Sequence, residues 1–87
     1  MEACMSNFQS KVKKQYEKEG YKVVKLIKLS ENGYPDLMAM KEGKAVFIEI
    51  KEDGDTLKPL QEMRIDELKA NGFEAFCLHK TKGRIYG

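Results

Sequence analysis

The sequence predicts an α/β fold whose elements follow the order α-β-β-β-α-β. Three observations support this prediction: an apolar stripe at helical spacing near the N-terminus, two short apolar runs joined by a polar turn, and a second helical segment bounded by proline and by Asn-Gly. The length of 87 residues suits one small domain with a modest core. We therefore expect residues 1–87 to form a single domain.

The first helix is expected over Cys4 to Glu19. Its apolar side chains recur at steps of three and four residues, which places them on one face. Gly20 follows at the position where helices commonly end. The stripe consists of Met5, Phe8, Val12 and Tyr16.

A strand over Tyr21 to Leu29 and a loop over Ser30 to Pro35 are predicted next. The strand contains valine, leucine and isoleucine among lysines, and the loop contains the serine, asparagine, glycine and proline typical of turns. Two apolar runs follow, Leu37 to Met40 and Ala45 to Ile48, and the polar segment Lys41 to Lys44 between them predicts a hairpin.

The hairpin places two carboxylates opposite each other. If Met40 pairs with Ala45 across the turn, Asp36 faces Glu49. Side chains alternate along a strand, so Lys51 lies on the same face. Opposed carboxylates repel at a separation of about 5 Å, and a cation between them relieves the repulsion.

A divalent metal site is the functional interpretation of this pattern. Oxygen ligands suit Mg²⁺ or Mn²⁺, and the backbone carbonyl of Ile50 could add a third oxygen beside Asp36 and Glu49. Lys51 could stabilise negative charge that develops during hydrolysis. The alternative is structural: Asp36 after Pro35 could cap a turn, and Glu49 and Lys51 could form a surface ion pair of little energy.

A second helix is predicted from Pro59 to Asn71-Gly72, with an apolar arc formed by Leu60, Ile65 and Leu68. Gln61 and Arg64 fall within this arc. Each could reach solvent from the edge of the arc, or the helix could face the metal site, where Gln61 would orient a water or a phosphate and Arg64 would contact a phosphate. A last strand is expected over Phe73 to Leu78.

The composition indicates a soluble globular protein, with 41% hydrophobic and 34% charged residues and a net charge of +2. No apolar run reaches the roughly 20 residues that cross a bilayer, and the N-terminus lacks the apolar core of a signal peptide, so we expect a cytoplasmic protein without membrane contact. Cys4 and Cys77 lack the spacing of a zinc site and are expected to be reduced. His79, the only histidine, is expected at a strand end or on the surface.

Three motifs resemble the PD-(D/E)XK nuclease superfamily. They are Gly33-Tyr34-Pro35-Asp36, then Phe47-Ile48-Glu49-Ile50-Lys51, then Leu57-Lys58-Pro59-Leu60-Gln61. Together with the element order, they are most similar to the virus-type replication-repair nuclease (VRR-NUC) domain, and the first two resemble archaeal Holliday junction resolvases. The resemblance covers Phe8 to Leu78 and implies a restriction-endonuclease-like core with a mixed central sheet flanked by helices.

The resemblance also implies roles for individual residues. Asp36 and Glu49 would be metal ligands, Lys51 the catalytic lysine, and Gln61 a helix glutamine near the attacking water. The family usually has a glutamate on the first helix where this chain has Gln9, and Glu2, two turns earlier, could stand in for it. The change leaves the number of bound metals open.

We therefore expect a Mg²⁺- or Mn²⁺-dependent, structure-specific DNA endonuclease that cuts branched or Holliday-like junctions. Arg64, Lys28, Ser30 and Lys58 are the residues expected to contact DNA. Stand-alone members of the family imply a homodimer, often phage-encoded, that acts in the host cytoplasm. The alternative is a nucleic-acid-binding module that keeps the nuclease fold with weak or no catalysis.

Overall fold

The computed structural model describes residues 6–87, which form two helices and a five-stranded sheet. The elements are α1 (Asn7–Lys18), β1 (Lys22–Lys25), β2 (Leu37–Lys41), β3 (Lys44–Lys51), α2 (Pro59–Ala70), β4 (Glu74–His79) and β5 (Gly83–Tyr86). The strands lie in sequence order, with β3 and β4 parallel and the other neighbours antiparallel. The predicted mixed sheet flanked by helices is confirmed, and no helix within residues 6–87 could cross a membrane.

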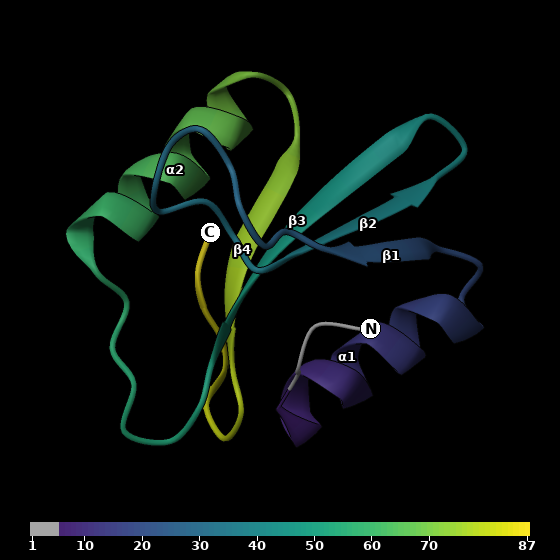
Figure 1. The fold of residues 1–87 in the computed structure, drawn as a ribbon, viewed down its shortest axis with the longest axis horizontal. Coiled ribbons are helices and arrows are strands. Elements are labelled where there is room, and N and C mark those ends of the chain that lie inside the picture. Colours follow the sequence, from purple (N-terminus) through teal and green to yellow (C-terminus); the bar gives the residue numbers. More distant parts are fainter. Residues whose placement is uncertain (1–5) are drawn as a thin grey trace.

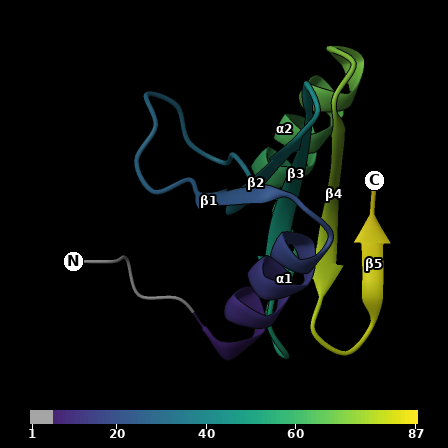
Figure 2. The same ribbon diagram turned by 90° about the vertical axis from the view of Figure 1, so that its right-hand side faces the viewer.

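The two helices lie on opposite faces of the sheet (Figures 1 and 2). On the α1 face, Val12 packs with alternate residues of the central strands, and Phe8 and Tyr16 border this core. On the α2 face, Ile65 packs against Ala75 and Cys77 of β4. The period-two alternation of β3 sends its odd-numbered side chains from Phe47 onward to the α2 face, so Glu49 and Lys51 lie on that face.

The described part of the first helix is shorter than predicted. It begins at Asn7 because the Ser6 hydroxyl accepts a hydrogen bond from the Gln9 main-chain N–H at 3.1 Å, which caps the first turn. The predicted residues Cys4 and Met5 lie outside the described residues.

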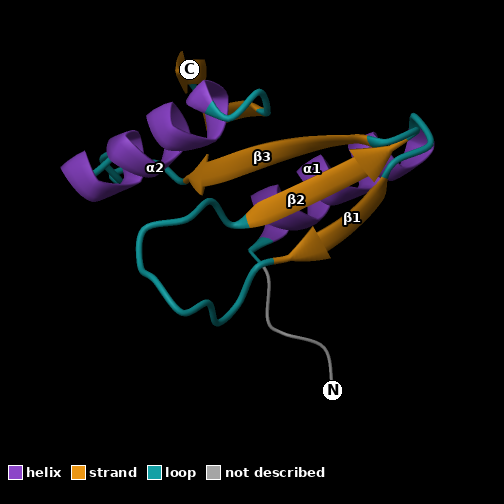
Figure 3. Cartoon of the chain, turned by 90° about the horizontal axis from the view of Figure 1, so that it is seen from above, coloured by secondary structure: helices purple, strands orange, loops and turns teal. Residues whose placement is uncertain are grey.

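The strand predicted to reach Leu29 ends at Lys25. The Leu26 N–H still bonds the Asp36 carbonyl at 2.8 Å, but then the chain leaves the sheet as a loop that runs from residue 26 to residue 36. Figure 3 shows this loop extending beyond the strands on the side of α2. Pro35 at its end is fully buried, so the loop returns to the sheet at a fixed point just before Asp36.

A fifth strand was missed by the sequence analysis. β5 pairs with β4 through a turn in which Gly83 has a φ of +75°, a conformation that favours glycine. The segment Arg84-Ile85-Tyr86 is only three residues of strand-forming pattern, too short to stand out from the sequence alone.

Candidate active site

The predicted hairpin register is confirmed, and it brings Asp36 to Glu49. Met40 pairs with Ala45 and Leu37 pairs with Ile48, so the next step along the hairpin sets Asp36 opposite Glu49. The side chains of these two residues share a hydrogen bond. The two carboxyl groups therefore occupy one site at the end of the β2–β3 ladder.

Asp36 is fixed by the main chain of β3. The Ile50 N–H donates to Asp36 Oδ2 at 2.8 Å, so the carboxylate takes the place of a strand partner where β2 has ended. The Lys51 carbonyl accepts from Lys80 N–H on the β4 side. Because successive residues of a strand direct their polar groups to opposite neighbours, the Ile50 carbonyl is directed to the Asp36 side.

Glu49 is a buried carboxylic acid with strongly altered acidity. Its residue is only 3% exposed, and burial, followed by the negative charge and hydrogen bond of Asp36, raises its pKa from 4.5 to about 8. Lys51 acts in the opposite direction, since its Nζ lies 3.6 Å from Glu49 Oε2. Lys51 is itself 7% exposed, whereas Asp36 is half-buried, so the cluster is open to solvent on the side of Asp36.

The donor set fits a hard divalent cation. Asp36 and Glu49 repel each other when both are ionised. Burial and this repulsion favour a proton on Glu49, and a bound cation would compensate the negative charge in place of that proton. Within residues 6–87, no group of three or more His, Cys, Asp or Glu side chains is arranged to hold a metal. The oxygens offered by Asp36, Glu49 and the Ile50 carbonyl suit Mg²⁺ or Mn²⁺ rather than zinc.

Gln61 lies in the first turn of α2 and has a structural role there. Its Oε1 accepts a hydrogen bond from the Lys58 main-chain N–H at 3.0 Å, which caps the helix. The Nε2 group of Gln61 remains for other contacts. The side chain is half-buried, which agrees with the position of Gln61 within the predicted apolar arc. Leu60, predicted as a core residue of the same arc, is instead 41% exposed.

Arg64 holds the loop of residues 26–36 against α2. Its Nε donates to the Asn32 carbonyl at 2.9 Å, and its guanidinium carbon lies 4.7 Å from the centre of the Tyr34 ring. Its Nη1 lies 3.4 Å from Glu31 and 3.3 Å from Glu67. These contacts anchor the loop to the helix, and a phosphate contact by Arg64 stays a prediction.

The remaining residues predicted to contact DNA lie on the surface. Lys28 and Ser30 are exposed in the loop of residues 26–36, and Lys58 is exposed directly before α2. Contact of these residues with DNA stays a prediction.

Gln9 of the first helix has an unsatisfied acceptor. Its Oε1 is buried without a hydrogen-bond partner, and among the described residues the only other such side-chain atom is Glu52 Oε2. A neutral amide at this position offers an oxygen but no charge to a cation. Glu2, the suggested substitute, lies outside the described residues.

Two neighbours of the site on β4 were not recognised in the sequence. Cys77 pairs with Glu49 in the parallel register, and burial raises the pKa of its thiol to about 11, so the thiol stays neutral. His79 pairs with Lys51 at the end of β4, as predicted for a strand end, but it is buried rather than on the surface. The His79 Nδ1 accepts from the N–H groups of Thr81 and Lys82, which fixes the orientation of the ring.

Comparison with known protein families decides the classification. The VRR-NUC domain model matches residues 3–81. The chain belongs to the VRR-NUC family. This result confirms the resemblance seen in the three motifs, and Asp36, Glu49 and Lys51 all lie within the matched residues.

Solved structures agree with this classification. A VRR-NUC domain structure is 27% identical in sequence and superposes with a TM-score of 0.69, with the match covering 79% of this chain and 76% of the other. Hjc, a Holliday junction resolvase from Archaeoglobus fulgidus, is 18% identical with a TM-score of 0.65, over 84% of this chain and 65% of the resolvase. The resolvase thus shares the fold of this VRR-NUC chain. A comparison with curated protein sequences found no match.

Proposed function

We propose that this VRR-NUC chain is a Mg²⁺- or Mn²⁺-dependent DNA endonuclease that hydrolyses phosphodiester bonds at branched DNA. The observation that carries the proposal is the pair of half-buried Asp36 and buried Glu49 with Lys51 beside it. Phosphodiester hydrolysis needs oxygen ligands for a cation and a positive group near the phosphate, and this cluster supplies both.

The residues divide the work between binding and charge stabilisation. Asp36, Glu49 and the Ile50 carbonyl would hold the cation, which when bound supplies Lewis-acid stabilisation of negative charge on the phosphate. Lys51 would direct its ammonium group at a phosphate oxygen, because its Nζ already lies within the cluster at 3.6 Å from Glu49. The free amide group of Gln61 would orient the attacking water.

Branched DNA is favoured as the substrate for two reasons. The resolvase that shares this fold is a Holliday junction enzyme, and both described helices pack against the central sheet and do not form a separate base-reading module. Cutting both strands of a junction needs two active sites, so we propose a homodimer. We also propose that the protein acts in the cytoplasm and that its gene is phage-encoded.

Cleavage of labelled DNA tests this proposal. Four-way junctions, flaps and linear duplex are incubated with the protein in Mg²⁺, in Mn²⁺ and in EDTA, with Asp36→Ala and Lys51→Ala as variants. We expect metal-dependent cleavage that prefers branched DNA and falls by at least about 100-fold in each variant. Cleavage in EDTA, or full cleavage by Asp36→Ala, would refute the proposal.

A second candidate function is a nucleic-acid-binding module with weak or no catalysis. The neutral Gln9, whose buried Oε1 has no partner, favours it because the site then carries only two side-chain carboxylates. Titration calorimetry separates the candidates: DNA binding without Mn²⁺ binding at millimolar concentration would support the module, and Mn²⁺ binding that depends on Glu49 would support the nuclease.

A further inference from the structure

An apolar pocket lies beside the candidate active site on the same face of the sheet. It has a volume of about 470 Å³, within the range of small-ligand pockets. We call it the loop pocket, because one wall is the loop of residues 26–36. Its lining residues are Leu26, Leu29, Ser30, Glu31, Tyr34, Phe47 and Leu68.

The loop pocket is continuous with the site through β3. Phe47 in the pocket and Glu49 in the site are two residues apart on the α2 face of one strand, a distance of about 7 Å along the strand. The loop that forms the opposite wall ends at Asp36. A nucleotide adjacent to a phosphate held by this site can therefore reach the loop pocket.

The walls of the loop pocket are held rigidly. The Tyr34 hydroxyl donates to Glu67 at 2.6 Å, and Arg64 lies over the Tyr34 ring. The Phe47 ring packs edge-to-face on Phe73, with ring centres 5.5 Å apart. Two fixed aromatic rings flanked by leucines are suited to pack against a flat apolar surface.

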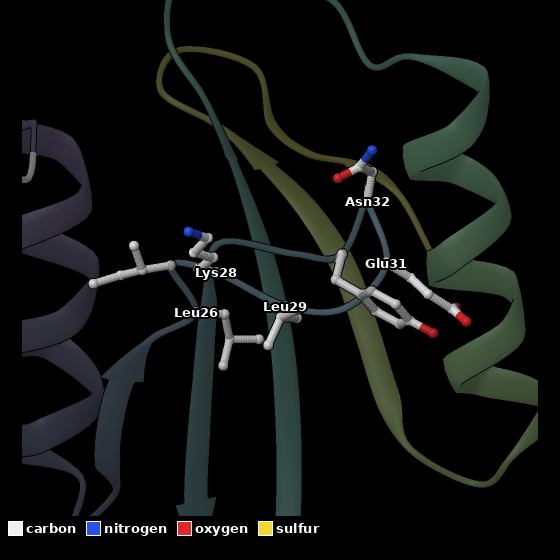
Figure 4. A pocket seen from close by; sticks show the side chains of 8 residues that line it. Leu26, Lys28, Leu29, Glu31 and Asn32 are labelled. Atoms are coloured by element: carbon white, nitrogen blue, oxygen red, sulfur yellow. The ribbon is translucent and has the colours of Figure 1, made fainter.

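The polar rim matches a nucleotide. Figure 4, which shows an adjoining pocket formed by the same loop, shows Leu26 and Leu29 projecting side by side, while Lys28, which does not line the loop pocket, points away from them. The lysine is exposed and positive, which suits a sugar-phosphate backbone outside the pocket. Arg64 Nη1 lies 3.4 Å from Glu31 Oε1 and partly compensates the negative charge of Glu31, which weakens its repulsion of the DNA phosphates.

From this arrangement we infer that the loop pocket holds one unstacked nucleobase of the DNA substrate, from a nucleotide next to the scissile phosphate. The inference rests on the proposed nuclease function. It adds a mechanism by which the enzyme would distinguish branched DNA from intact duplex. Bases at a branch or bulge are unstacked at little cost, whereas a base in a regular duplex must first be extracted. Stacking against aromatic side chains accepts any base, so the pocket selects DNA structure and not sequence.

Binding to bulged DNA tests the inference. The probe is a fluorescent duplex with a single-nucleotide bulge that carries either adenine or an abasic sugar, with Ca²⁺ in the buffer and fluorescence anisotropy as the measurement. Stacking of one base contributes about 1–3 kcal/mol, so we expect the adenine bulge to bind about 10-fold more tightly than the abasic bulge.

Two variants in the same loop provide a matched comparison. Leu29 is 47% exposed and lines the loop pocket, whereas Ile27 is 70% exposed and does not line it. Both Leu29→Asp and Ile27→Asp add one negative charge and remove one exposed aliphatic side chain. We expect Leu29→Asp to abolish the preference for adenine over the abasic sugar and Ile27→Asp to retain it.

The outcomes separate this inference from the proposed function. Equal affinity of the unsubstituted protein for both bulges would overturn the nucleobase pocket while leaving the nuclease proposal intact, and absence of DNA binding to any probe would remove both. Analytical ultracentrifugation of the same proteins tests whether a second copy of the chain occupies the loop pocket instead. A dimer that Leu29→Asp converts to a monomer, without any base dependence, would identify the pocket as a contact between two copies and overturn the inference.

Discussion

The main-chain N–H of Ile50 donates a hydrogen bond to Asp36 Oδ2 over 2.8 Å. This bond extends the β2–β3 pairing past the last backbone pair, from one residue beyond Leu37 to two residues beyond Ile48. One oxygen of Asp36 thus replaces a strand partner, and its carboxyl group also meets Glu49. The residue that would bind the cation is aligned by the same strand that carries the second ligand.

Replacing Asp36 should separate its structural role from its chemical role. Asp36→Ala leaves the half-buried Ile50 N–H without its acceptor, so we expect a loss of about 1–2 kcal/mol in the free energy of unfolding. Asp36→Asn keeps an acceptor oxygen and removes a charge that repels Glu49, so its stability at pH 8 should equal or exceed that of the unsubstituted protein. Urea unfolding measures both, and cleavage should be lost in both. Equal destabilisation by the two variants would contradict this account.

The acidity of Glu49 makes the stability of the metal-free protein depend on pH. The folded-state pKa of about 8 lies above the unfolded value of 4.5, so the folded protein binds more protons between these values and its stability falls as pH rises through this range. Glu49→Gln removes this penalty. We expect the variant to be more stable by about 2 kcal/mol at pH 8 in EDTA, measured by urea unfolding.

The unsubstituted protein and Glu49→Gln, compared at low pH and with Mn²⁺, provide the controls for this prediction. Below pH 4.5 both side chains are neutral, so the difference in stability should disappear. Millimolar Mn²⁺ should stabilise only the protein with Glu49, because the cation displaces the proton from the carboxyl group. A difference that is constant from pH 4 to pH 8 would show that burial and Asp36 do not perturb Glu49.

The centre of the site could be predicted from the sequence because hairpin geometry is local. The polar turn of residues 41–44 sets Met40 against Ala45, and from this one pair the ladder places Asp36 at Glu49 without knowledge of the rest of the fold. Strand alternation then puts Lys51 on the same face. Both rules act over a few residues, so they hold before any tertiary contact is known.

The surroundings of the site could not be predicted because they depend on contacts between distant segments. Cys77 and His79 reach Glu49 and Lys51 only through the parallel register of β3 and β4, which no turn fixes. Arg64 contacts the Asn32 carbonyl across 32 residues of sequence. Helical periodicity placed Arg64 within the apolar arc of its helix but gave no information about its partners.

Gly33 should be indispensable for the loop that precedes Asp36. It has a φ of +88°, and a Cβ at this position would lie 2.6 Å from Leu60 Cγ. Gly33→Ala therefore combines backbone strain with a collision, and we expect a loss of about 2–3 kcal/mol in the free energy of unfolding. Cleavage should fall as well, because displacement of the loop by about 1 Å moves Asp36 from its position. Thermal unfolding and single-turnover cleavage measure the two effects.

Gly43 and Leu60 supply the controls for Gly33. Gly43 has a φ of +79° with nothing within 4 Å of an added Cβ, so Gly43→Ala reports the backbone strain alone and should cost about 1 kcal/mol. Leu60 is 41% exposed, and Leu60→Ala should therefore be mild by itself. The double variant Gly33→Ala/Leu60→Ala should recover most of the loss beyond that of Gly43→Ala, because only the Leu60 main-chain carbonyl, 3.3 Å from the added Cβ, remains in tight contact. No recovery at all would mean that the Leu60 side chain is not the group that requires glycine.

Gln61 has a cap role that can be separated from the predicted role in catalysis. Its Oε1 accepts from the Lys58 N–H at 3.0 Å, and a glutamate preserves this acceptor while adding a negative charge that favours a helix N-terminus. Gln61→Glu should therefore match the unsubstituted protein in stability, whereas Gln61→Ala should lose about 1 kcal/mol. If the amide group orients the attacking water, both variants should cleave DNA about 10-fold more slowly or worse, because neither keeps an amide donor. Urea unfolding and single-turnover cleavage are measured on the same preparations. Full cleavage by Gln61→Glu would leave Gln61 as a helix cap and remove it from the reaction.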